Sequence, residues 1–118
     1  VGPSFGHRGK FELTNKSFIT ASALSNAGMK VALTTDAPVT PLHTLPLMAG
    51  MAVAAGMDEM EALKAITINA AEIVDVADRV GSLEVGKDAD IVIYDGHPFA
   101  INGKAWKVLI DGQVVHSC

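Results

Sequence analysis

An apolar run that ends in an acid is the feature that most constrains this fold. Residues 29–35 read Met-Lys-Val-Ala-Leu-Thr-Thr, and Asp36 and two prolines follow before position 42. The central Val-Ala-Leu suits a strand that is buried in a sheet, and proline cannot continue the ladder. A single strand cannot form a sheet, because its edges would face water. The sequence therefore predicts a buried strand over residues 29–35 whose neighbours it does not itself supply.

Helical patterns surround this strand. Helices are expected over residues 17–27, from residue 44 to residue 55, and in two shorter segments after residues 58 and 69. Gly28 and Gly56 stand where a helix can end in the left-handed conformation. Asp58 and Asn69 are each followed three positions later by a glutamate, which is the spacing of a capped helix start. The first 80 residues therefore read as helices around one strand.

After residue 80 the pattern changes to short strands and turns. Strands are expected over residues 82–85, 90–94, 105–110 and 113–116. Asp111-Gly112 is a strong signal for a two-residue hairpin. Four short antiparallel strands after a helical part indicate a domain boundary, and we expect domains over residues 1–80 and 81–118.

Charge and composition exclude several classes of protein. The formal net charge is −4 and the nine lysines and arginines are scattered, so a nucleic-acid partner is not expected. No apolar run approaches the roughly 20 residues of a membrane span. The single cysteine, Cys118, cannot form an internal disulfide, which favours a cytoplasmic location.

Asp36 is the leading candidate for chemistry. Open α/β sheets and α/β barrels bind ligands at the carboxyl ends of their strands, where Asp36 is expected. A carboxylate there could bind a metal ion or take a proton from a metal-bound water. The alternative is a structural role, since an aspartate before Ala-Pro is ordinary turn chemistry.

Further candidates lie in the loops on either side. His7 and His43 could assist Asp36, although no HxH or HExxH spacing is present and both also suit surface positions. Arg8 and Lys10 could hold a substrate carboxylate, or could belong to a solvated basic loop. His97 and His116 fall in the strand-rich part and are interpreted as structural or solvated.

Several motifs carry a family resemblance over nearly the whole chain. The segments "VALTTDAPV", "TLPLMAGMAV", "ALKAITINAAEI" and "VGSLEVGKDADIVIYDGHPF" resemble the C-terminal part of the metal-dependent amidohydrolase superfamily, most of all its imidazolonepropionase-like members. The resemblance implies an α/β fold: the last strand and helices of a (β/α)8 TIM-like barrel, followed by strands of a small β-sandwich domain. Asp36 matches the aspartate at the end of the eighth strand, which in this family binds metal and shuttles protons.

The resemblance also implies what the intact protein does. Such proteins use a divalent metal, most often zinc, and water to hydrolyse non-peptide C–N bonds in small-molecule substrates. The family's other metal ligands have no counterpart here, and the chain would start near the end of strand seven. One carboxylate is a poor metal site, so we expect this chain alone to bind no catalytic metal and to be inactive. The alternative is a non-catalytic scaffold or interaction module that associates with itself through an exposed sheet edge.

Overall fold

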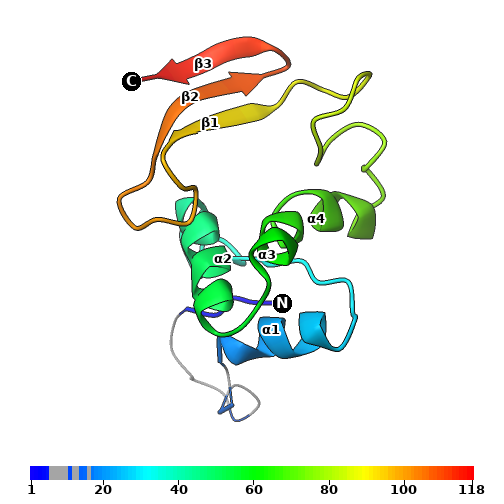
Figure 1. Cartoon of the computed structure of the whole chain (residues 1–118), viewed down its shortest axis with the longest axis vertical. Helices are drawn as coiled ribbons and strands as arrows, with labels where there is room; N and C mark the ends of the chain where they lie inside the picture. The colour runs from blue at the N-terminus through cyan, green and yellow to red at the C-terminus, as the bar shows by residue number, and fades with distance from the viewer. Residues whose placement is uncertain (6–10, 12–13, 16) are drawn as a thin grey trace.

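The chain folds into helices followed by a small antiparallel sheet (Figure 1). The computed structural model describes residues 1–5, 11, 14–15 and 17–118. Its elements are α1 (Ile19–Asn26), η2 (Leu42–Thr44), α2 (Leu45–Ala54), α3 (Glu59–Ala65), α4 (Ile68–Ile73), β1 (Ile91–Asp95), β2 (Lys104–Ile110) and β3 (Gln113–Ser117). The α/β class is as expected, whereas the barrel and sandwich assignment and the boundary at residue 80 stay predictions. None of the helices in the described part of the chain has the length and apolar character that a membrane crossing requires.

Helices α1 and α2 end in the same backbone motif, as their glycines predict. The φ angle is +81° at Gly28 and +99° at Gly56, a region that glycine enters without steric cost. In α1 the Gly28 N–H donates to Ser25, and the following N–H, of Met29, donates to the Leu24 carbonyl oxygen at 3.1 Å. The same two bonds recur at the end of α2. Each glycine therefore satisfies carbonyl groups that the helix end would leave unpaired.

The two predicted helix starts have different outcomes. Asp58 caps α3 as expected, because its Oδ1 accepts the N–H of Glu61 at 3.0 Å. The prediction that Asn69 caps a helix is wrong, because Thr67 precedes α4 and Asn69 lies inside it. The Asn69 side chain is buried and donates to the carbonyl oxygen of Val31 at 3.1 Å. Pairing a buried carbonyl across the fold outweighs a local cap, since an unpaired buried acceptor is costly.

The expected strand over residues 29–35 is extended but is not part of the sheet. Side chains at positions 31, 33 and 35 are buried and those between them are more exposed, which is the alternation of a strand. One edge of the segment contacts the start of the chain. The Val1 nitrogen donates to the Ala32 oxygen at 2.6 Å, and the Thr34 N–H donates to the Val1 oxygen at 2.9 Å. These two bonds have the pattern of a parallel strand pair.

The opposite edge of the segment contacts helices rather than a strand. The Leu33 N–H donates to the carbonyl oxygen of Ala65, the last residue of α3, at 3.0 Å. The Val31 carbonyl accepts the Asn69 amide described above. The expectation that the chain supplies no neighbours for this segment is therefore wrong for residues 31–34, because Val1 pairs with one edge and groups of the helices pair with the other.

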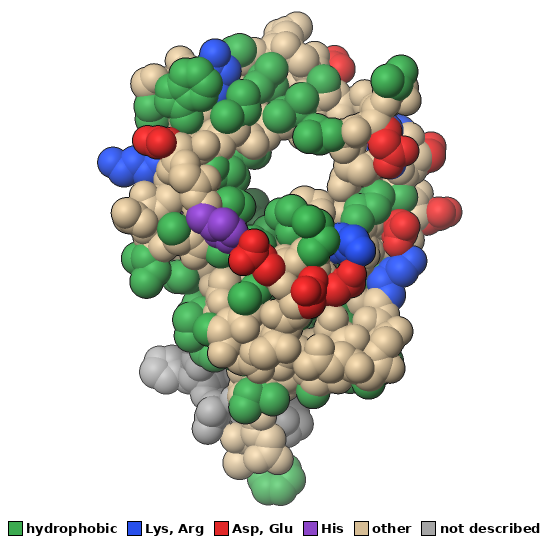
Figure 2. All heavy atoms as spheres, viewed as in Figure 1, with side chains coloured by type: hydrophobic (Ala, Val, Ile, Leu, Met, Phe, Trp, Pro, Cys, Tyr) green, Lys and Arg blue, Asp and Glu red, His purple; other side chains and the backbone are tan. Residues whose placement is uncertain are grey.

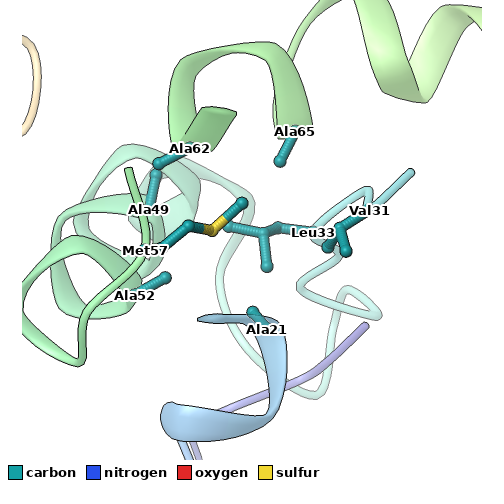
Figure 3. Close-up of a cluster of buried hydrophobic side chains, with 8 residues drawn as sticks. All are labelled: Ala21, Val31, Leu33, Ala49, Ala52, Met57, Ala62 and Ala65. Carbon is teal, nitrogen blue, oxygen red and sulfur yellow. The ribbon is translucent and has the colours of Figure 1, made fainter. Parts of the chain in front are cut away.

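The core of the helical part lies between the extended segment and helices α1, α2 and α3 (Figure 3). Its buried cluster consists of Ala21, Val31, Leu33, Ala49, Ala52, Met57, Ala62 and Ala65. Most of these side chains are single methyl groups, and Ala49, Ala62 and Ala65 have no solvent-accessible surface. Small side chains at these positions let the backbones of neighbouring elements approach one another closely.

The sheet has the order β1-β2-β3, with antiparallel pairing throughout. Its strands match three of the four predicted ones to within one residue at each end. Asp111 and Gly112 join β2 to β3 with φ angles of 48° and 74°, as a type I′ hairpin requires. The predicted hairpin is therefore confirmed.

The expected strand over residues 82–85 does not form. Its polar side chains bond to one another instead: Ser82 Oγ donates to Glu84 Oε1 at 2.6 Å, and Lys87 Nζ donates to Ser82 Oγ at 2.5 Å. Gly86 follows with a φ of +95°, which turns the chain away from an extended path. A local side-chain network and a tight turn thus replace strand pairing here.

The sheet stands apart from the helices and is joined to them by two connections (Figure 1). One is the segment after α4, and the other is the β1–β2 loop, which reaches α2. In that loop Phe99 packs against the helical core beside Gly50, where a Cβ atom would lie 3.2 Å from the Phe99 Cβ. Figure 2 shows an opening between the sheet and the helices, so these connections hold the sheet in place.

Candidate functional site

Asp36 follows the extended segment directly and begins the turn over residues 36–39. Its φ of 51° is left-handed, a conformation that aspartate tolerates better than most residues. The Asp36 N–H donates to Thr34 Oγ1 at 3.2 Å, and the Val39 N–H donates to the Asp36 carbonyl oxygen at 2.9 Å. The backbone therefore closes the turn. Within the described part of the chain, the exposed Asp36 carboxylate accepts no hydrogen bond, so the turn does not depend on it as a cap.

Of the other predicted site residues, one lies within the part of the chain that the structure describes. His43 is exposed in η2. His7, Arg8 and Lys10 lie outside the described residues. In residues 1–5, 11, 14–15 and 17–118, no three His, Cys, Asp or Glu side chains are close enough to hold a metal ion. A catalytic zinc needs about three protein ligands, so this part of the chain offers one carboxylate and not a complete site.

The loop after Asp36 contains a buried hydroxyl that the sequence did not single out. Thr40 is 4% exposed, and its Oγ1 has no hydrogen-bond partner among the described residues. An unpaired buried hydroxyl costs about 1–3 kcal/mol, so it is uncommon in a native structure. A threonine between two prolines carries no sequence signal that separates it from ordinary loop residues.

His97 forms the other polar arrangement at a concave surface. A shallow pocket between α3 and the β1–β2 loop is lined by Glu59, Met60, Leu63, His97, Pro98 and Phe99. His97 Nε2 lies 3.1 Å from Glu59 Oε1, and His97 Nδ1 accepts the Phe99 N–H at 3.2 Å. Both ring nitrogens are therefore engaged in contacts within the chain. The expectation of a structural His97 agrees with this geometry.

Asn69 does not cap α4 as its spacing predicts. Its side chain instead reaches the extended segment that leads to Asp36. The available signal was an amide inside an otherwise apolar stretch, Thr-Ile-Asn-Ala-Ala. A polar side chain on the buried face of a short helix needs a partner, and a backbone carbonyl of the adjacent segment is the natural one.

Comparison with known proteins matches these motifs to one family. A model described as "Amidohydrolase family" matches residues 4–116. An imidazolonepropionase of Geobacillus sp. (strain WCH70) is 42% identical over 78 residues, which cover 64% of this chain and 18% of that protein. An imidazolonepropionase of Shouchella clausii (strain KSM-K16) is 36% identical over 110 residues, which cover 80% of this chain and 25% of that protein. The chain thus spans a quarter or less of the length of these relatives.

Solved structures agree with the sequence matches. An amidohydrolase from Thermotoga maritima MSB8 superposes with a TM-score of 0.94 at 40% identity, covering 100% of this chain and 31% of that one. A Xaa-Pro dipeptidase with bound methionine in its active site gives a TM-score of 0.73 at 28% identity, covering 86% of this chain and 26% of that one. With the family model matching nearly every residue and a solved member superposing over the full length, we conclude that this chain belongs to the amidohydrolase family.

Proposed function

We propose that this chain is the C-terminal part of a metal-dependent hydrolase that cleaves a non-peptide C–N bond, in an amide or a cyclic amide. Residues 1–80 form the last strand and helices of a (β/α)8 barrel, and residues 81–118 form strands of a small β-sandwich domain. Support comes from the family match over residues 4–116 and from the full-length superposition on the Thermotoga maritima amidohydrolase. The intact protein uses a divalent metal, for which zinc suits a site of nitrogen and carboxylate donors.

The place of Asp36 is the observation that carries the proposal. It stands at the carboxyl end of an extended, half-buried segment, where α/β barrels carry their catalytic side chains. Its carboxylate is exposed and makes no hydrogen bond within the described residues, so it is available as a metal ligand and as a proton acceptor. His43, Arg8 and Lys10 are the proposed substrate contacts.

Ligand count limits what the isolated chain can do. One carboxylate does not hold a catalytic metal, so the 118-residue chain alone binds none and hydrolyses nothing. Calorimetric titration with Zn²⁺ and an amide-hydrolysis assay test this together. Micromolar binding with turnover would overturn the proposal of an incomplete site.

Relatives favour one substrate class over another. The two imidazolonepropionases are 42% and 36% identical to this chain, whereas the dipeptidase is 28% identical. This difference favours a non-peptide C–N bond over a dipeptide bond. Assaying cyclic amides and Xaa-Pro dipeptides side by side with a longer protein that contains this chain distinguishes the two.

Replacing Asp36 tests its catalytic role. In that longer protein, Asp36→Asn should lower kcat by about a thousandfold, because the amide neither accepts a proton nor binds metal as well as a carboxylate does. Asp58→Asn is the matched control, since it removes one negative charge but keeps an acceptor at the cap of α3. Activity of Asp36→Asn within a few-fold of the unchanged protein would refute the role.

The second candidate function is a non-catalytic scaffold or interaction module. The observation that favours it is β3, an edge strand of five exposed residues without a formal charge (Gln-Val-Val-His-Ser). Uncharged edge strands can pair with another chain. Light scattering that shows a dimer, together with a monomer for Val115→Lys, would support this candidate; a monomeric unchanged chain would not.

A further inference from the structure

Two side chains of α4, three positions apart, bind the extended segment. Asn69 is 8% exposed, and its Nδ2 donates to the Val31 carbonyl oxygen at 3.1 Å across 38 positions of sequence. Glu72, on the same face of α4, forms an ion pair with Lys30. Helix α4 therefore binds two consecutive residues at the start of the segment that leads to Asp36.

The Asn69 amide occupies the position of a strand partner. In an extended chain, consecutive residues point their N–H and C=O groups to opposite edges. Ala32 and Thr34 bond to Val1 on one edge, so the Val31 carbonyl and the Leu33 N–H face the other. A parallel neighbour would bond to this pair of groups. Here Asn69 supplies the donor and the Ala65 carbonyl supplies the acceptor.

This pairing sets the register of the segment. A slip by one residue would exchange the buried side chains of Val31 and Leu33 with the more exposed ones between them. It would also turn the N–H and C=O groups of odd-numbered residues toward Val1, in place of those of Ala32 and Thr34. Asp36 lies five positions beyond Val31 in an extended chain, so its place in space follows from where Val31 is held.

We propose that Asn69 is a positioning residue for Asp36. Its side-chain amide, acting as a substitute strand N–H on Val31, holds the register at which the segment presents the carboxylate. The proposal rests on the function proposed for Asp36, since a metal ligand must be placed to within about 0.5 Å.

Paired variants separate positioning from a general loss of stability. Asn69→Ala removes the bond to Val31. Ser22→Ala is the matched control, because Ser22 is also buried and donates to a distant backbone carbonyl, that of Ala55, at 2.9 Å. We expect Asn69→Ala to shift the NMR signals and the φ-dependent coupling of Asp36 and to speed amide exchange of Leu33 by roughly tenfold or more. Ser22→Ala should leave both unchanged.

A second measurement needs no variant. In the unchanged chain, the Asn69 side-chain amide protons and the Leu33 and Thr34 N–H groups should exchange with the same urea dependence, since they open as one unit. Free exchange of the Asn69 amide while Leu33 stays protected would overturn the proposal, as would a folded Asn69→Ala chain with unchanged Asp36 signals.

The test of the positioning role of Asn69 can fail or succeed independently of the test of the catalytic role of Asp36. If Asp36 responds to Asn69→Ala while Asp36→Asn keeps its activity in the longer protein, then the positioning is correct and the catalytic role fails. If Asp36→Asn abolishes activity but Asp36 does not respond to Asn69→Ala, then the catalytic role holds and the positioning fails.

Discussion

His97 Nε2 lies 3.1 Å from Glu59 Oε1, and this contact joins the β1–β2 loop to the first residue of α3. Because His97 Nδ1 accepts the Phe99 N–H, the neutral ring carries its proton on Nε2 and donates it to the carboxylate. The ring of Phe99 lies 5.3 Å from that of His97, edge to face. One histidine therefore orients the loop that fastens the sheet to the helices.

We expect His97→Ala to loosen this loop more than it destabilises the chain. The two side chains are 48% and 65% exposed, so the pair contributes about 1 kcal/mol or less to the free energy of unfolding. Amide exchange over residues 96–103 should nevertheless accelerate. His116→Ala, on β3, is the control and should leave exchange in that loop unchanged. A loop as protected in His97→Ala as in the unchanged chain would contradict the expectation.

Gly81 and Gly86 allow the steric cost of an added Cβ atom to be separated from backbone strain. Their φ angles, +94° and +95°, are nearly identical. A Cβ at Gly81 would lie 2.8 Å from the Ala71 Cβ, whereas nothing lies within 4 Å of one at Gly86. Gly86→Ala should cost about 1–2 kcal/mol through backbone strain alone.

Gly81→Ala carries the same strain plus the clash with Ala71 and α4, so it should cost about 1–3 kcal/mol more than Gly86→Ala. Urea denaturation of both variants measures the difference. Equal losses of stability would show that α4 moves away freely.

Glu84 has a lowered pKa, chiefly because Ser82 donates a hydrogen bond to its carboxylate and secondarily because Lys87 is near. A lowered folded-state pKa contributes stability above the unfolded value, and this contribution is lost as the pH falls through the lower folded value. Ser82→Ala and Lys87→Met should therefore each raise the Glu84 pKa toward its ordinary value. A carboxylate NMR titration of the three chains checks this, and an unchanged Glu84 pKa in Ser82→Ala would disprove the role of the hydrogen bond.

Asp58 should contribute to the stability of α3 as a hydrogen-bond acceptor rather than as a charge. Asp58→Ala removes the bond to the Glu61 N–H and should lower the free energy of unfolding by about 1 kcal/mol. Asp58→Asn keeps an acceptor and should cost only a few tenths of that amount by the ranking of caps. Thermal unfolding of both variants distinguishes the two causes, and equal effects would assign the role to the charge.

Local signals in the sequence predicted the ends of the elements well. Gly28, Gly56 and Asp58 act within one turn of their own position, so their neighbours in sequence determine their role. Asp111-Gly112 is similar, because a type I′ turn depends on its two central residues. Asp36 was also placed correctly at the end of the extended segment, since proline and the apolar run mark that end.

Predictions failed where a distant partner decided the structure. Asn69 has the spacing of a cap, but Val31, 38 positions away, takes its amide. Residues 82–85 have the composition of a strand, but they pair with no other strand among the described residues, and Ser82 bonds to Lys87 instead. A complete metal site could not be predicted for a related reason: such a site needs ligands from several elements, and Asp36 is the candidate ligand that the family resemblance indicates.

The alanine-rich core of the helical part bears on how the chain responds to temperature. Five of the eight buried side chains in the cluster are alanines, so each buries little apolar area of its own. The heat capacity of unfolding scales with the apolar area that becomes exposed. We therefore expect a small heat-capacity change of unfolding per residue for this part. Its free energy of unfolding should then change little on cooling.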